Sequence, residues 1–153
     1  MSTHRNLAPV SVDPARLRLD AADGSAGTLL GMRCLDCSAY VFGLAVFCQA
    51  CTSSRLEPAD LSRSGILYSY TIVRVPPSGW PGAAPYVLGE VELPEGPHVL
   101  AEVIGADEED LQIGIDVKLA LQKVTSGESE KPRIVYKWTP ANCGQSEMRE
   151  AHN

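Results

Sequence analysis

The stretch Cys34-Leu-Asp-Cys37, followed after ten residues by Cys48-Gln-Ala-Cys51, decides how the first part of this chain folds. Each C-x2-C pair predicts a tight turn whose two thiolates point the same way. The residues from Ser38 to Phe47 are enough for a short hairpin that brings the two pairs face to face. Four thiolates at about 2.3 Å then close a tetrahedral site with no open position, so the spacing predicts a structural Zn²⁺.

The same four cysteines also suit two other arrangements. Four thiolates also suit iron, as in a rubredoxin-like site. Two disulfides need an oxidising compartment, but Met1–Ala8 contains no apolar segment typical of an export signal, and Leu29–Met32 is far too short to span a membrane. We therefore expect reduced, metal-binding cysteines in a cytoplasmic protein.

The composition limits the classes of partner. The 153 residues suit one domain or two small ones, and 44% are hydrophobic, so a packed core is expected. The net charge of −6 argues against nucleic acid, whose affinity comes mainly from clustered Lys and Arg. No apolar run approaches a membrane span. The 13 glycines and 11 prolines favour short strands and turns over long helices.

Alternating apolar residues after the cysteines predict five strands. The predicted strands are Gly65–Val75, Tyr86–Leu93, His98–Gly105, Ile115–Leu121 and Arg133–Thr139. A Pro/Gly loop around Trp80 joins the first two, and a hairpin turn over Pro94–Pro97 joins the next two. A single helical turn over Asp107–Leu111, capped by the Asp107 carboxylate, precedes the fourth. This order is that of an OB-fold barrel, and a small open sandwich is the alternative that the same alternation leaves open.

The fold class is therefore mainly β, with an N-terminal rubredoxin-like zinc ribbon followed by a five-stranded OB-fold barrel. Residues 1–27 are predicted to form an N-terminal arm and hairpin, in which Arg16–Leu19 pairs back on Thr28–Arg33 after an extended Met1–Pro14. The zinc ribbon is assigned to residues 28–56, with Leu56–Ser64 as its connection to the barrel. The OB fold is assigned to 57–141 and a loose tail to 142–153.

Several short motifs, taken in order and spacing, resemble a known family over Met32–Ala141. They are the cysteine ribbon, Gly65-x-Leu67-Tyr68-Ser69-Tyr70-Thr71, Ala84-Pro85-Tyr86-Val87, Glu95-Gly96, Asp110-Leu111-x-Ile113-Gly114 and Tyr136-Lys137-Trp138-x-Pro140-Ala141. The chain is similar to the acyl-CoA-associated zinc-ribbon/OB-fold proteins, first catalogued as being of unknown function. Many members open with an amphipathic helix, a pattern that Pro14–Gly27 does not show, so a contact made by that helix is not carried over.

The resemblance implies a non-catalytic accessory subunit in a hetero-oligomer. Partners in the family are thiolase-like enzymes, lipid-transfer-type aldolases or acyl-CoA dehydratases, and the larger partner holds the catalytic residues. The small subunit stabilises the assembly and can complete or bridge the CoA site. Within the family the chain resembles the small subunit of a thiolase that cleaves β-ketoacyl-CoA in aromatic acyl-CoA degradation.

No catalytic set stands out in the residues themselves. The sequence contains no nucleophile elbow, zinc-protease motif, phosphate loop or dinucleotide fingerprint. His98 is interpreted as a solvated residue beside a turn, His4 and His152 lie in the terminal segments, and Cys143 is interpreted as an idle thiol that no His or Asn is placed to activate. A single-stranded nucleic-acid binder is the rival class, because OB barrels serve there, but the acidic balance and the missing basic stripe argue against it.

Contact residues are predicted instead. Trp80, in its Pro/Gly loop, is expected either to contact a partner, as exposed aromatic side chains often do, or to fold back onto the barrel. Tyr136 and Trp138 are assigned to the core or its rim. The basic residues late in the chain are expected either to meet CoA phosphates or to be merely solvated. They are Lys123, Lys131, Arg133 and Lys137.

Overall fold

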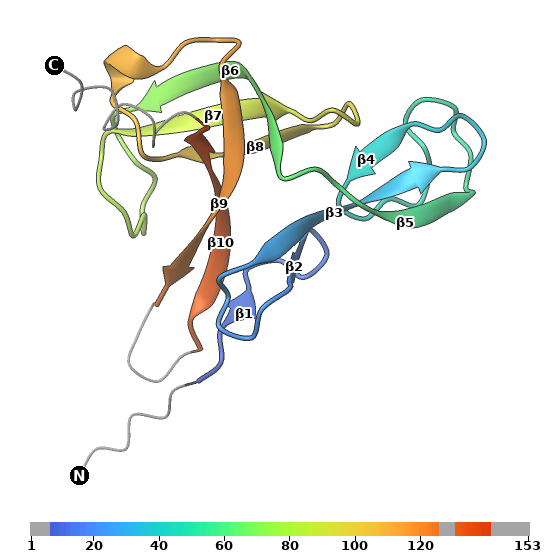
Figure 1. Ribbon diagram of the computed structural model, residues 1–153, viewed down its shortest axis with the longest axis horizontal. Coiled ribbons are helices and arrows are strands. Elements are labelled where there is room, and N and C mark those ends of the chain that lie inside the picture. Colours follow the sequence, from blue (N-terminus) through green and yellow to red (C-terminus); the bar gives the residue numbers. More distant parts are fainter. Residues whose placement is uncertain (1–6, 126–130, 142–153) are drawn as a thin grey trace, which may run out of the picture. The chain divides into compact units, whose positions relative to one another are not determined.

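The computed structural model describes residues 7–125 and 131–141, and the regular secondary structure of this part of the chain is almost entirely β-strand (Figure 1). Its elements are β1 (Val10–Ser11), β2 (Leu17–Leu19), β3 (Gly27–Cys34), β4 (Tyr40–Phe42), β5 (Leu56–Asp60), β6 (Ser64–Val73), β7 (Tyr86–Glu92), β8 (His98–Val103), the 3-10 turn η1 (Glu108–Asp110), β9 (Asp116–Val124) and β10 (Arg133–Pro140). The chain divides into two compact units, residues 1–61 with 121–136 and residues 62–120 with 137–153. Strands β9 and β10 contribute residues to both.

Strand β3 is the centre of the first unit. Its first residues pair antiparallel with β2, where Leu17 lies opposite Leu29, so the predicted N-terminal hairpin is confirmed. Both leucines are fully buried. Further along, β3 pairs with β4 and with β5, and Gly31 lies opposite both Phe42 and Ala59. A Cβ at Gly31 would collide with a backbone carbonyl of β4, so only glycine allows this approach.

Two strands of this unit were not predicted. The connection assigned to Leu56–Ser64 contains β5, which pairs antiparallel with β3 over five residues. The sequence of β5 shows no apolar alternation and includes Pro58, so its pairing comes from β3 and not from its own pattern. The extended N-terminal arm contains β1, which pairs in parallel with the start of β10, with Val10 opposite Arg133.

The second unit is built on the barrel strands. Strands β6, β7 and β8 form an antiparallel meander, β9 pairs with β6, and β10 pairs in parallel with β8. An additional pairing of β9 with β10 closes the ring of five strands (Figure 1). The register of β6 shifts between Leu67 and Ser69, a bulge that increases local bending. The predicted OB-fold barrel is therefore confirmed.

The barrel interior follows the predicted alternation. Leu67, Val91, Val99 and Val117 have no exposed surface, and neither has Trp138. The indole Nε1 of Trp138 donates to the carbonyl oxygen of Val99 at 3.3 Å, so its one polar atom is satisfied inside the core. Each such apolar side chain contributes roughly 1.5–3 kcal/mol by burial. The assignment of Trp138 to the core is confirmed.

The helical turn before β9 differs from the prediction. It is a single 3-10 turn, η1, and the side chain of Asp107 makes no capping hydrogen bond. The predicted cap is therefore wrong, and the turn is held by backbone bonds, such as that from the N–H of Asp110 to the carbonyl of Asp107 at 3.0 Å. Within residues 7–125 and 131–141, no helix is long and apolar enough to cross a membrane.

Candidate metal centre

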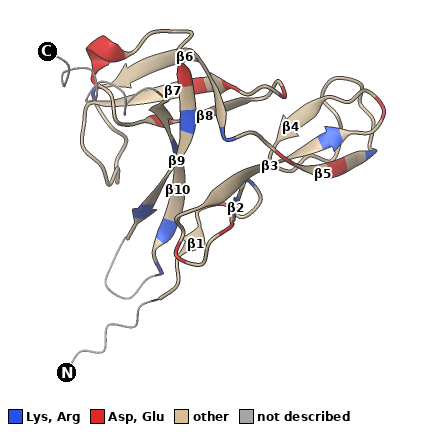
Figure 2. Ribbon diagram, viewed as in Figure 1, with Lys and Arg blue, Asp and Glu red and all other residues tan. Residues whose placement is uncertain are grey.

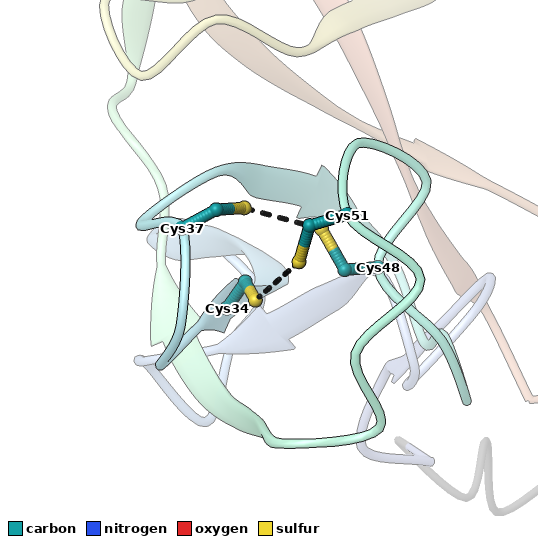
Figure 3. Close-up of side chains that lie close together, drawn as sticks. All are labelled: Cys34, Cys37, Cys48 and Cys51. Atoms are coloured by element: carbon teal, nitrogen blue, oxygen red, sulfur yellow. Dashed lines mark hydrogen bonds between the residues drawn. The ribbon is translucent and has the colours of Figure 1, made fainter.

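The two cysteine pairs meet in the first unit. Cys34 ends β3 and Cys37 lies in the turn toward β4, whereas Cys48 and Cys51 lie in the loop before β5. Figure 3 shows the four side chains converging, and their sulfur atoms all lie within 4.8 Å of one another. The sulfurs of Cys34 and Cys51 are 3.5 Å apart, as are those of Cys37 and Cys48.

These distances fit a tetrahedral metal. A tetrahedron of sulfurs at about 2.3 Å from zinc has edges of about 3.8 Å, close to the 3.5 Å sulfur separations. Four soft ligands from one short stretch suit zinc or iron and leave no position for a substrate. The cluster can therefore hold one metal ion in a closed, structural coordination.

Backbone turns of the same type shape both cysteine pairs. The N–H of Ser38 donates to the carbonyl of Cys34 at 3.0 Å, and the N–H of Thr52 donates to that of Cys48 at 2.8 Å. Ser38 and Thr52 each have a φ of 64°, a left-handed conformation that favours glycine. A side chain there costs of order 1–3 kcal/mol, so this conformation persists only because the surrounding site enforces it.

Backbone donors prepare the two inner sulfurs for a cation, against the opposing effect of burial. Cys34 and Cys48 are buried, whereas Cys37 and Cys51 are exposed. The backbone N–H of Cys37 donates to the sulfur of Cys34 and lowers the pKa of that thiol to about 6. The N–H of Cys51 lowers the pKa of Cys48 in the same way. Because only the thiolate binds metal, these donors reduce the free energy needed to deprotonate Cys34 and Cys48.

A polar network that the sequence did not reveal links the two knuckles. The carboxylate of Asp36, inside the first C-x2-C pair, accepts a hydrogen bond from the Ser53 hydroxyl and one from Nη1 of Arg55 at 2.8 Å. The N–H of Leu35 donates to the carbonyl of Arg55 at 2.9 Å. These bonds link residues of the second knuckle to residues of the first, beside the cysteine cluster.

The predicted contact residues are distributed over both units. Trp80 is half-buried and stacks on Tyr86, with ring centroids 4.1 Å apart and an interplanar angle of 12°. Among the described residues its Nε1 is buried without a hydrogen-bond partner. The ammonium of Lys137 lies 2.6 Å from Glu102, and both side chains are less than one fifth exposed.

The other three basic residues are exposed and belong to the first unit. Lys123 lies near the end of β9, Arg133 is the first residue of β10, and Lys131 precedes that strand by two residues. Figure 2 shows Lys and Arg in blue on both strands. In the sequence, these three residues flank the connection from β9 to β10.

His98 is held by partners that sequence reasoning missed. Its Nδ1 lies 2.7 Å from Glu90 and its Nε2 lies 3.1 Å from Glu92, while its ring lies 4.6 Å from that of Tyr68. The hydrogen bond to Glu90, followed by that to Glu92, raises the pKa of His98. Register alone could have indicated part of this, because Glu92 lies opposite His98 in the hairpin. His4, Cys143 and His152 lie outside the described residues.

A ribbon with a four-cysteine cluster and a closed five-stranded barrel define this chain as a cysteine-ribbon/OB-fold protein. Residues 59–122 match the family model described as the C-terminal OB-fold domain of ChsH2. The chain belongs to the DUF35 family, as relatives of similar length show. The resemblance inferred from the sequence motifs is thereby confirmed.

The relatives of this chain include proteins named as a scaffold protein, a thiolase subunit and a component of an aldolase. The chain is 32% identical to a DUF35 domain-containing scaffold protein of Methanothermobacter thermautotrophicus, over 63% of this chain and 73% of that protein. It is also 32% identical to the benzoylsuccinyl-CoA thiolase subunit BbsA of Thauera aromatica, over 76% of this chain and 79% of that subunit. A solved structure titled Ltp2-ChsH2(DUF35) aldolase superposes with a TM-score of 0.62 at 25% identity, covering 74% of this chain and 85% of that one.

Proposed function

We propose that this chain is a non-catalytic accessory subunit of an acyl-CoA-processing complex, most closely related in role to the small subunit of a thiolase. The observation that carries the proposal is the similarity to benzoylsuccinyl-CoA thiolase subunits over about three quarters of both chains. The closed cysteine cluster supports it, because such a metal site stabilises a fold and offers no position for a substrate. The reaction, cleavage of a β-ketoacyl-CoA, would take place in the larger partner.

Zinc is the metal that we assign to Cys34, Cys37, Cys48 and Cys51. Bound there, Zn²⁺ would supply folding free energy and no chemistry, and apparent binding free energies of structural zinc are about 10–16 kcal/mol. An iron–thiolate centre is coloured, whereas a zinc centre is colourless, so the absorption spectrum of the purified protein distinguishes the two.

The same proposal assigns a secondary contact with CoA. Lys123, Lys131 and Arg133 are exposed and can reach phosphate groups at a shared interface. Lys137 is paired with Glu102, so it contributes to phosphate binding only if that ion pair opens. Trp80 would contact the partner through the ring face that Tyr86 does not cover.

A lipid-transfer-type aldolase is the second candidate partner. It is favoured by the structural match to the Ltp2-ChsH2(DUF35) aldolase, whose TM-score is 0.62. An acyl-CoA dehydratase is a third possibility within the same proposal. The role of this chain is the same in each case, and only the reaction of the larger subunit changes.

The deciding experiment is gentle purification of the tagged chain from its native host, followed by native mass spectrometry of the intact assembly. We expect a larger subunit with a thiolase-type sequence and one zinc per copy of this chain. An aldolase or dehydratase partner would correct the choice of enzyme. A chain that is purified alone, or that turns over an acyl-CoA by itself, would refute the accessory role.

A further inference from the structure

Four large apolar side chains of the ribbon are exposed to solvent. Leu44 and Val46 are each 76% exposed, Phe47 is 61% exposed and Leu35 is 45% exposed. We call these four residues the ribbon patch. Scattered exposed leucines are normal, but several large apolar side chains in one short segment are typical of an interaction surface.

The segment that carries the patch is fixed at both ends. The N–H of Gly43 donates to the carbonyl of Leu30 at 2.9 Å, and the N–H of Cys48 donates to that of Ser53 at 2.8 Å. The segment that holds Leu44, Val46 and Phe47 therefore begins and ends at backbone hydrogen bonds. A surface held in place before binding loses less conformational entropy when a partner docks.

The metal cluster organises the two parts of the patch. Leu35 lies between Cys34 and Cys37, and Phe47 directly precedes Cys48. The sulfurs of Cys37 and Cys48 are 3.5 Å apart, so one metal ion bound by the cluster would tie both parts together. Removing the metal would free the two knuckles and with them the relative placement of Leu35 and Phe47.

The ion pairs of the ribbon and the net charge of the chain indicate which class of partner covers the ribbon patch. The guanidinium of Arg55 lies 2.8 Å from Asp36, and that of Arg33 lies 3.4 Å from Glu57. The ribbon's own ion pairs thus compensate these cations, which disfavours an anionic membrane or nucleic acid, both of which need uncompensated Lys or Arg. A second copy would bring another chain of net charge −6, and such like charge opposes self-association.

We propose that the ribbon patch is the surface that inserts into an apolar cleft of the larger catalytic subunit, and that the metal is required to assemble it. The inference rests on the proposed function, because it identifies the partner as the enzyme of the same complex. It gives the cysteine cluster a role beyond stability, since loss of metal would abolish docking while the barrel stays folded.

The test uses the full chain and the partner subunit that is purified with it. The variant Leu44→Ser/Val46→Ser removes the two most exposed side chains of the patch, and Leu100→Ser/Ile113→Ser is the matched control. Leu100 and Ile113 are 58% and 68% exposed and lie in the other unit. Affinity for the partner is measured by calorimetry, metal content by mass spectrometry and folding by circular dichroism.

We expect the patch variant to keep its metal and melting temperature but to bind the partner at least about tenfold more weakly, as truncation of interface anchors does. The control variant should bind like the wild type, and the chelated wild type should lose binding until Zn²⁺ is restored. Equal affinity of the patch variant and the wild type would overturn the inference. So would wild-type dimers that the patch variant does not form. Failure of the wild type to bind any enzyme is a separate result that refutes the proposed function itself.

Discussion

Replacing Trp138 by Phe should destabilise the barrel markedly. The indole of Trp138 has no exposed surface, and its Nε1 donates to the carbonyl of Val99. Phenylalanine lacks three of the ring atoms, which costs about 2 kcal/mol in lost burial and residual cavity. The Val99 carbonyl also loses its indole donor, which adds about 1 kcal/mol. We therefore expect Trp138→Phe to lower the free energy of unfolding by about 3 kcal/mol.

Trp80→Phe is the matched control because these are the chain's two tryptophans. The Trp80 ring stacks on Tyr86, and among the described residues its Nε1 is buried without a hydrogen-bond partner. Phenylalanine at this position therefore keeps the stacking and removes an unsatisfied donor. We expect a change within about 1 kcal/mol. Urea unfolding followed by circular dichroism measures both variants, and a loss of 3 kcal/mol shifts the midpoint by about 1–3 M. Equal losses in the two variants would refute this account of the core.

Three further predictions concern the ribbon and the barrel surface. Gly31→Ala should lower ribbon stability by about 1–3 kcal/mol, measured by the temperature at which metal is released, because the new Cβ would overlap the carbonyl of Val41. Cys37→Ser should reduce bound metal well below one equivalent by mass spectrometry, and retention of a full equivalent would contradict four-cysteine coordination. The hydrogen bond to Glu90 raises the pKa of His98 in the folded protein above 6.5. The ion pairs of protonated His98 therefore stabilise the fold fully below about pH 6.5, and this stabilisation is lost as the pH rises through the higher folded pKa. The melting temperature should fall over that window in the wild type and much less in Glu90→Gln.

Local patterns predicted the elements whose cause is local. The two C-x2-C pairs indicated the cluster because each knuckle is closed by bonds within a few residues, such as that from Ser38 to Cys34. Alternation along Tyr86–Glu92 predicted β7 because its inward residues are buried at every second position. Trp138 was assigned to the core for the same reason.

The errors have a common physical origin. The strand β5 and the short strand β1 exist because β3 and β10 offer unpaired backbone edges, and the pattern of β5 itself gives no sign of this. Asp107 resembled a helix cap, but its side chain makes no hydrogen bond to η1, whose turn is held by backbone bonds. Propensity is a weak guide wherever a distant strand supplies the hydrogen bonds.

The sequence by itself determined that four cysteines with metal-ligand spacing precede five alternating strands, since both signals depend on neighbouring residues. Only the tertiary structure decided that Asp36 and Arg55 join the knuckles, that His98 lies between two carboxylates, and that Trp80 stacks on Tyr86. Only the structure showed that the side chains of Leu44 and Val46 are exposed to solvent. These features depend on which segments meet in space, and that is settled by strand pairing and packing over long sequence separations, which local periodicity does not encode.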